Sequence, residues 1–272
     1  MTLSRREVTE ILAARGLAPS RALGQNFVVD ANTVRKIAHL AEVGPGDHVV
    51  EIGAGLGSLT RALLETGAHV VAIEVDRGLV PILRDLETEN KEQLAVIEAD
   101  AMKLDWDDLL KGHDNWKLIA NLPYNVATPL VADILDYVPA IKSMLVMVQF
   151  EVGERMVAKP KSGAFGALSV KVAYWAEARI VGSVSPQVFL PRPKVTSALV
   201  RIIRREKPAV EVDPTKLFEL VRTAFGQRRK MLRRSLAGTV TEAQFAAAGV
   251  ASDARPEELD VQDWGRLCQA MS

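Results

Sequence analysis

The chain has 272 residues, 48% of them hydrophobic, and its 34 lysines and arginines balance 34 aspartates and glutamates. This length fits one large core with a small second lobe, because single cores stop growing near about 250–300 residues. The sequence has no apolar run of the roughly 20 residues that a membrane span needs and no signal peptide, so we expect a soluble, cytoplasmic protein. We also expect a monomer. A single cysteine, Cys268, and four scattered histidines predict neither a disulfide nor a metal site.

The first part of the chain alternates between two hydrophobic patterns. Helical spacing at 5–15 and 31–41 flanks an irregular loop at 19–30. Strands alternating with helices then predict an α/β fold with a doubly wound, Rossmann-like sheet. Strands are expected at 48–53, 68–74, 94–98, 116–120 and 143–149, and helices at 59–64, 79–86 and 129–135, with a polar helical stretch after 149.

The second part predicts an edge to this sheet and then a helical domain. β-branched runs at 178–184 and 197–203 flank a proline-rich loop and predict an antiparallel edge pair. A linker at 207–214 precedes helices expected at 216–236, 241–248 and 261–271. We therefore expect a catalytic domain at 1–206 and a small all-helical domain at 207–272.

The charge is unevenly distributed. Residues 192–234 carry 13 lysines and arginines against 4 acidic residues, whereas residues 1–183 carry 19 against 24. Clustered basic side chains suit a polyanion, because they release condensed counterions when they neutralise phosphates. A solvated basic helix is the alternative interpretation of the same residues.

A glycine-rich motif, EIGAGLG at 51–57, follows the first predicted strand of the sheet and predicts a nucleotide cofactor site. Gly53 and Gly55 would let the backbone approach a ligand closely. A dinucleotide fingerprint requires glycine at position 58, where Ser58 stands, so S-adenosylmethionine is favoured. Glu74 ends the next strand, where a carboxylate accepts hydrogen bonds from ribose hydroxyls. Asp100 is placed either to accept from an adenine amine or to cap a helix.

The tetrapeptide Asn121-Leu122-Pro123-Tyr124 directly follows the fourth strand of the sheet. An exocyclic adenine amine is a weak nucleophile, and the Asn121 side-chain oxygen and the Leu122 carbonyl would orient it as acceptors. Pro123 stiffens the turn, and the ring of Tyr124 is suited to stacking on an extruded base. The predicted reaction is in-line attack of the amine on a sulfonium methyl without a metal. An ordinary turn after a strand is the alternative.

Together with five further motifs, these residues resemble the small-subunit branch of the ribosomal RNA adenine N6-dimethyltransferase family. The match covers roughly positions 20–235. The further motifs are LGQNF at 23–27, QFEVGER at 149–155, VSP at 184–186, FLPRPK at 189–194 and AFGQRRK at 224–230. The resemblance implies dimethylation of two adjacent adenosines in the 3′-terminal hairpin loop of 16S ribosomal RNA, within an assembling small subunit.

The resemblance also implies roles for individual residues. Asn26 and the backbone of Val28 would contact the cofactor alongside Gly53, Glu74, Asp100 and Asn121. Phe189 would face Tyr124, so that the two rings sandwich the target adenine. The RNA backbone would be bound by a basic helix that carries Arg222, Arg228, Arg229, Lys230, Arg233 and Arg234.

The sequence departs from the family pattern at Val28, where leucine is usual, and at Gly153, where alanine is common. We expect the second departure only to weaken a helix. One alternative is the sister family of large-subunit RNA methyltransferases that confer macrolide resistance, which Leu122 disfavours because that family usually has isoleucine there. Others are a noncatalytic RNA-binding assembly factor and a nicotinamide-dependent dehydrogenase, which Ser58 disfavours.

Overall fold

The structure, a computed structural model, describes residues 2–124 and 126–271 and divides into two compact units. The first contains the chain up to Gly153 together with Arg179–Ile203, and the second contains Glu154–Ala178 and the chain from Arg204 onward. These units differ from the domains expected at 1–206 and 207–272, because residues 154–178 group with the C-terminal helices.

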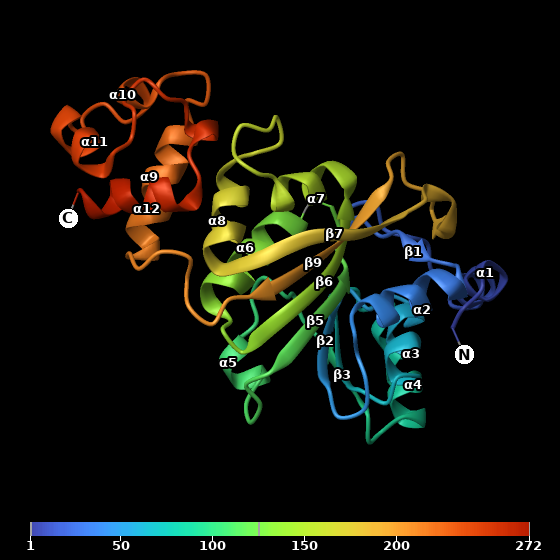
Figure 1. Ribbon diagram of the computed structural model, residues 1–272. Helices are drawn as coiled ribbons and strands as arrows, with labels where there is room; N and C mark the ends of the chain where they lie inside the picture. The colour runs from blue at the N-terminus through green and yellow to red at the C-terminus, as the bar shows by residue number, and fades with distance from the viewer. Residues whose placement is uncertain (1, 125, 272) are drawn as a thin grey trace. The chain divides into compact units, whose positions relative to one another are not determined.

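A seven-stranded sheet with the order β4-β3-β2-β5-β6-β9-β7 forms the centre of the first unit (Figure 1). The strands from β4 to β6 run parallel, and β9 pairs antiparallel with β6. The predicted doubly wound sheet with an antiparallel edge is therefore confirmed. The strands are β2 (His48–Ile52), β3 (His69–Glu74), β4 (Leu94–Glu98), β5 (Trp116–Asn121), β6 (Ile141–Gln149), β7 (Ala176–Val184) and β9 (Ser197–Arg204).

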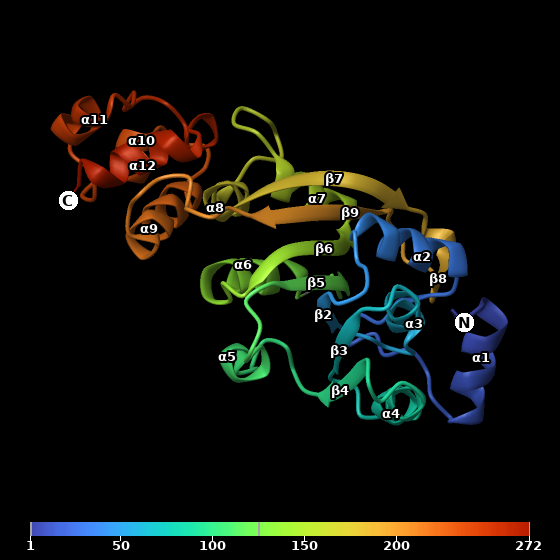
Figure 2. The same cartoon turned by 60° about the horizontal axis from the view of Figure 1, so that its bottom comes forward.

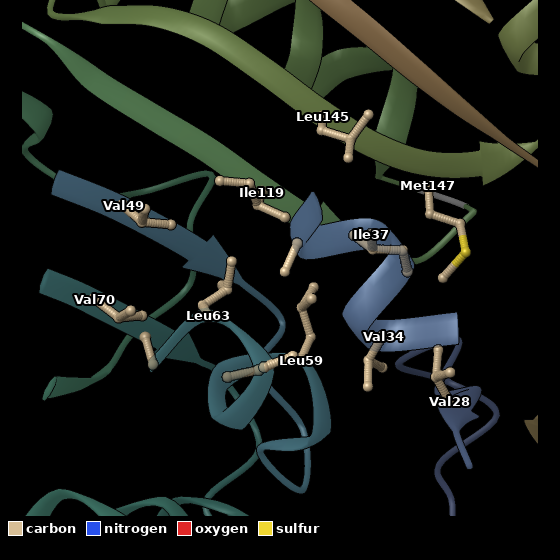
Figure 3. Packing of buried hydrophobic residues seen from close by; sticks show 14 of the residues in the cluster. Val28, Val34, Ile37, Val49, Leu59, Leu63, Val70, Ile119, Leu145 and Met147 are labelled. Atoms are coloured by element: carbon tan, nitrogen blue, oxygen red, sulfur yellow. The ribbon is translucent and has the colours of Figure 1, made fainter. Parts of the chain in front are cut away.

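Helices cover both faces of this sheet. One face packs against α2 (Ala31–Leu40), α3 (Ser58–Leu64) and α4 (Val80–Glu89) through a cluster of buried aliphatic side chains. Figure 3 shows Leu63 of α3 beside Val49 of β2, within this cluster. Figures 1 and 2 show α5 (Trp106–Leu109) and α6 (Ala127–Tyr137) on the opposite side of the sheet. The strand order reverses between β2 and β5, and in such sheets this is where ligands bind.

The N-terminal segment forms more structure than its sequence pattern predicts. Helix α1 (Arg5–Ala14) begins at a capping box formed by Ser4 and Glu7. The stretch expected to be irregular contains β1 (Phe27–Val28), which pairs antiparallel with β8 (Phe189–Leu190), just after the short 3-10 helix η1 (Pro186–Val188). Strands this short have no periodic signal, so the sequence could not predict the pairing.

Gly153 lies in α7 (Phe150–Val157), where that helix approaches β9. A Cβ atom at this position would lie 2.8 Å from the Cβ of Ala198 and 3.1 Å from a methyl group of Val200. The expectation that this glycine only weakens a helix is therefore wrong. The missing side chain also lets the helix approach the sheet more closely than alanine would allow.

Helices make up most of the second unit, around a core that includes Tyr174, Phe245 and Trp264. The helix predicted at 216–236 is only partly correct, because the observed helix ends at Phe225 and a separate short helix follows at Leu232–Ser235. Gly226 is a poor helix former, and the N–H groups of the later residues 232 and 233 donate to carbonyls in 252–254, a tertiary contact without a sequence signal. The helices are α8 (Ala167–Trp175), α9 (Pro214–Phe225), α10 (Leu232–Ser235), α11 (Glu242–Ala248), the 3-10 helix η2 (Pro256–Glu258) and α12 (Val261–Gln269).

Across residues 2–124 and 126–271, the structure has no helix with the length and apolar composition that crossing a membrane requires.

Candidate active site

A cavity of about 250 Å³ opens at the carboxyl ends of the parallel strands, within the first unit. It brings together the predicted cofactor residues and the tetrapeptide Asn121–Tyr124, which begins with the last residue of β5. The predicted residues that line it are Asn26, Val28, Gly53, Gly55, Glu74, Asp100, Asn121, Leu122, Pro123 and Tyr124.

The glycine-rich motif forms the turn between β2 and α3, and its glycines adopt backbone conformations that other residues rarely reach. Gly55 has φ +61°, and a Cβ atom there would lie 3.2 Å from the ring of Phe27. Its N–H donates to Glu74 Oε2 at 2.7 Å. The turn therefore holds the N–H of Gly55 against the carboxylate of Glu74, the last residue of β3, at the cavity wall.

Glu74 is only 5% exposed, and backbone donors hold its carboxylate. Besides Gly55, the N–H groups of Val75 and Asp76 donate to Oε1 at 3.0 and 2.9 Å. Burial raises the pKa of Glu74, and the charge of Asp76 adds to this, whereas the three backbone donors lower it. The donors fix the carboxylate in one orientation, as binding the two adjacent hydroxyls of a ribose requires.

Glu51 also lines the cavity, and we had not singled it out from the sequence. Burial, together with the charge of Glu74, raises the pKa of Glu51 to about 8, although hydrogen bonding by Thr60 lowers it in part. Among the described residues, no group forms a hydrogen bond with Glu51 Oε2. The signal that could have revealed it is a lone acidic residue in an otherwise apolar strand, HVVEI.

The charges of the cavity lining fit a cationic ligand. The lining contains three carboxyl groups, those of Glu51, Glu74 and Asp100, and within the described chain no lysine, arginine or histidine lines it. A dinucleotide would bring an anionic pyrophosphate next to these carboxyls, whereas S-adenosylmethionine brings a sulfonium and an ammonium group. The unpartnered oxygen of Glu51 is an acceptor that such a cation would satisfy.

The LGQNF segment covers the cavity and is tied to the turn after β3. Gln25 accepts a hydrogen bond from the Ser20 N–H and donates to Asp76 Oδ2, both at 2.7 Å. The Asn26 side chain donates to the Gly24 carbonyl at 3.0 Å. The side chain of Val28 is buried in the core, and Val28 also lines the cavity.

Asp100 lines the cavity, and it also holds the turn after β4. Its Oδ1 accepts from the Met102 N–H at 3.0 Å, and its Oδ2 lies 3.5 Å from Lys103 Nζ. Asp100 therefore stabilises a turn and does not cap a helix, since the N-cap of α5 is Asp105. This role does not exclude a contact with a bound adenine.

The tetrapeptide Asn121–Tyr124 at the end of β5 is held by hydrogen bonds at both of its ends. Asn121 Nδ2 donates to the Asn26 carbonyl at 2.9 Å. Because a carbonyl oxygen only accepts, this bond fixes the amide orientation and leaves the Asn121 oxygen as an acceptor. At the other end, the hydroxyl of Tyr124 is hydrogen-bonded to Ser197 Oγ at 3.2 Å. Sequence analysis missed Ser197, which is completely buried.

Phe189 does not line the cavity. Its side chain is 1% exposed and belongs to the buried cluster between the sheet and α2–α4, because the β1–β8 pairing sets it opposite Val28. In this structure, Phe189 and Tyr124 are therefore not arranged to sandwich a base. A stacking role for Phe189 would require its ring to leave this cluster.

The six candidate RNA-binding side chains are all exposed in the second unit, but they do not share one helix. Arg222 lies on α9, Arg233 and Arg234 lie on α10, and 228–230 form the turn between these helices. Arg228 donates to the Gly163 carbonyl at 2.9 Å and therefore also has a structural role. The described residues contain no group of three or more His, Cys, Asp or Glu side chains that suits a metal ion.

The sheet topology and the carboxyl-lined cavity define a Rossmann-like methyltransferase that depends on S-adenosylmethionine. Its fold is similar to that of a dimethyladenosine transferase from Plasmodium falciparum, with a TM-score of 0.73 and 23% identity over 88% of this chain and 94% of that one. The 23S rRNA methyltransferase ErmE is also similar, with a TM-score of 0.66 and 25% identity over 90% of this chain and 99% of that one.

Comparison of sequences identifies the family. The model described as "Ribosomal RNA adenine dimethylase" matches residues 19–272. A relative from Cutibacterium acnes is 46% identical over 94% of this chain and 90% of its own length, and one from Streptomyces avermitilis is 44% identical over 97% and 92%. Both are named ribosomal RNA small subunit methyltransferase A. The chain belongs to the ribosomal RNA adenine dimethylase family.

Proposed function

We propose that this chain transfers methyl groups from S-adenosylmethionine to the exocyclic amines of adenosines in small-subunit (16S) ribosomal RNA and forms N6,N6-dimethyladenosine. The observation that carries this is a cavity lined by three carboxyl groups and, among the described residues, by no basic side chain, whose lining includes Asn121 and Tyr124. Two relatives that are 46% and 44% identical are named for the small ribosomal subunit rather than the large one. The two adjacent adenosines of the 3′-terminal hairpin loop, in an assembling particle, are the substrate that the family resemblance implies.

The cofactor would lie along the cavity from the glycine-rich turn to the tetrapeptide. The Glu74 carboxylate would accept from the ribose hydroxyls, and Asp100 from the adenine amine. The turn at Gly53 and Gly55 and the backbone of 26–28 would enclose the remaining parts. Glu51, whose pKa is about 8 without a ligand, would release its proton on binding and neutralise a positive charge of the cofactor. When bound, S-adenosylmethionine supplies a methyl group attached to a cationic sulfur.

At the reacting end, this chain's contribution is orientation. The Asn121 oxygen, left as an acceptor by the bond to Asn26, and the Leu122 carbonyl would each accept an N–H of the adenine amine. These acceptors direct the nitrogen lone pair toward the methyl carbon. The amine would take the methyl group that the bound cofactor supplies, the electron pair of the carbon–sulfur bond would remain with the cofactor, and the displaced amine proton would pass to water.

Tyr124 and Pro123 would hold the base in the cavity. An aromatic face under an extruded base contributes about 1–3 kcal/mol and accepts any base. The hydrogen bond to Ser197 fixes the position of the Tyr124 hydroxyl. The basic side chains of the second unit would bind the RNA backbone as a salt-sensitive and sequence-independent contribution. We also propose that the protein acts as a monomer in the cytoplasm.

Asn121→Ala tests this assignment. The chain and its variant are incubated with undermethylated small subunits and S-adenosylmethionine, and the RNA is digested to nucleosides. We expect dimethyladenosine from the wild-type chain and none from the variant, because the amine loses an acceptor. Cofactor affinity measured by calorimetry should fall only modestly. Near-normal transfer by the variant would refute the role of Asn121, and no product from the wild-type chain would refute the function.

A further inference from the structure

Phe150 and Tyr137 are the exposed aromatic side chains within the described part of the chain, with exposed fractions of 38% and 73%. Tyr137 ends α6, which starts at the edge of the sheet where the cavity lies and runs away from it. Phe150 begins α7, directly after β6 ends at that edge. Only Phe150 therefore lies beside the proposed reaction site.

Phe150 is close to Tyr124 through a short chain of contacts. Because β9 is antiparallel to β6, the first residue of β9 lies at the edge where β6 ends, and Ser197 pairs with Gln149. The Phe150 N–H donates to the Thr196 carbonyl at 3.0 Å. The next residue, Ser197, is hydrogen-bonded to Tyr124. The backbone of Phe150 therefore lies next to the start of β9, which is hydrogen-bonded to Tyr124 of the cavity lining.

The segment 192–195, which leads into β9 next to Phe150, is also largely exposed, and it is basic. Val195 has an exposed fraction of 43%, and Arg192 and Lys194, which precede it, are exposed as well. Among residues 2–124 and 126–271, neither basic side chain forms an ion pair within 4.0 Å. An apolar contact area with free cations beside it matches a nucleotide, which has a flat apolar base and an anionic phosphate.

We infer that Phe150, with Val195 beside it, is a stacking platform for the base adjacent to the adenosine that enters the cavity. This inference rests on the proposed function. A base drawn into the cavity leaves its neighbour without a stacking partner, and an exposed aromatic ring nearby restores one. Arg192 and Lys194 bind the phosphates next to that base. Phe150 is thus a positioning residue and takes no part in the methyl transfer.

For two adjacent adenosines, the platform has a specific consequence. While one adenosine occupies the cavity, the other stacks on Phe150, so the pair is held in a defined order. The ring accepts any base, because every base has a π face, and a purine offers more stacking surface than a pyrimidine. The platform therefore favours the adenosine pair without reading its hydrogen-bonding edges.

Phe150→Ala tests the platform, with Phe150→Trp as the conservative variant and Tyr137→Ala as the control for loss of an exposed aromatic elsewhere. Transfer kinetics are measured on undermethylated small subunits. We expect Phe150→Ala to raise KM for the particle about tenfold, a typical loss for one stacked base. The tryptophan variant should restore KM, and Tyr137→Ala should leave it unchanged. Cofactor affinity should match that of the wild-type chain in all three variants, which also reports that the fold is intact.

A particle that lacks the adjacent base separates stacking from any general effect on the site. Small subunits are assembled on 16S RNA in which the neighbour of the target adenosine is an abasic nucleotide, introduced by ligating a synthetic 3′ fragment. We expect wild type and Phe150→Ala to have the same KM on this particle. An equal loss on intact and abasic particles, or no loss on either, would overturn the inference. No transfer by the wild-type chain to intact particles would instead overturn the proposed function and this inference with it.

Discussion

Replacing Glu51 with glutamine should change how the stability of the protein depends on pH. The Glu51 carboxyl is completely buried, and its pKa is raised from the ordinary 4.5 to about 8. In the unfolded chain the carboxyl ionises near its ordinary pKa, so the folded state holds a proton that the unfolded state has lost. Stability from the neutral carboxyl is therefore fully present below pH 4.5 and is lost as the pH rises to about 8.

The size of the effect follows from the pKa difference. Each pKa unit corresponds to about 1.4 kcal/mol, so the difference between 4.5 and 8 gives an upper limit of about 5 kcal/mol. Glutamine has nearly the same shape and does not titrate. Its amide adds a constant offset to the free energy of unfolding but no slope. Other titrating groups contribute equally to both proteins and cancel in the difference.

Urea unfolding at intervals from pH 5 to pH 9 measures this difference. We expect the wild-type chain to lose a few kcal/mol relative to Glu51→Gln over this range, and the difference to level off above pH 8. The control is Glu65→Gln, because a hydrogen bond from Arg35 lowers the pKa of Glu65 and its contribution changes only at acid pH. Parallel curves for wild type and Glu51→Gln would show that the carboxyl is already ionised in the folded state.

Two further substitutions test the packing and the basic surface. Gly153→Ala should destabilise the first unit by about 1–3 kcal/mol in thermal unfolding, because the new Cβ would lie 2.8 Å from Ala198, whereas Gly163→Ala, with open space around it, should not. Equal stabilities of these two variants would contradict the close approach of α7. Replacing Arg229, Lys230 and Arg233 together by alanine should weaken binding to the small subunit and flatten its salt dependence, while cofactor affinity stays unchanged. An unaltered salt slope would mean that these side chains are only solvated.

Much of the sheet could be predicted from the sequence, because strands buried on both faces are short apolar runs that end in glycine or polar residues. The helical unit was harder to predict. Helix α8 was missed because Ala167–Trp175 is apolar on most sides and shows no amphipathic spacing. The helix expected at 216–236 ends early because its backbone N–H groups find partners about 20 residues further along the chain.

The site shows the same division between local and long-range information. The glycine turn, Glu74 and the tetrapeptide were found because each is a local motif at the end of a strand. The bonds from Gln25 to Asp76 and from Tyr124 to Ser197 join residues 51 and 73 positions apart, and no local pattern indicates them. The buried position of Phe189 likewise follows from a pairing with β1 that is distant in sequence.

The central claim is that this chain methylates adenosines of the small ribosomal subunit. Undermethylated small and large subunits are incubated in parallel with the chain and S-adenosylmethionine labelled in its methyl group, and the labelled nucleosides are identified. The account predicts dimethyladenosine in small-subunit RNA alone. Label in large-subunit RNA would identify the chain as a resistance-type enzyme instead, and no label in either RNA would contradict a catalytic role.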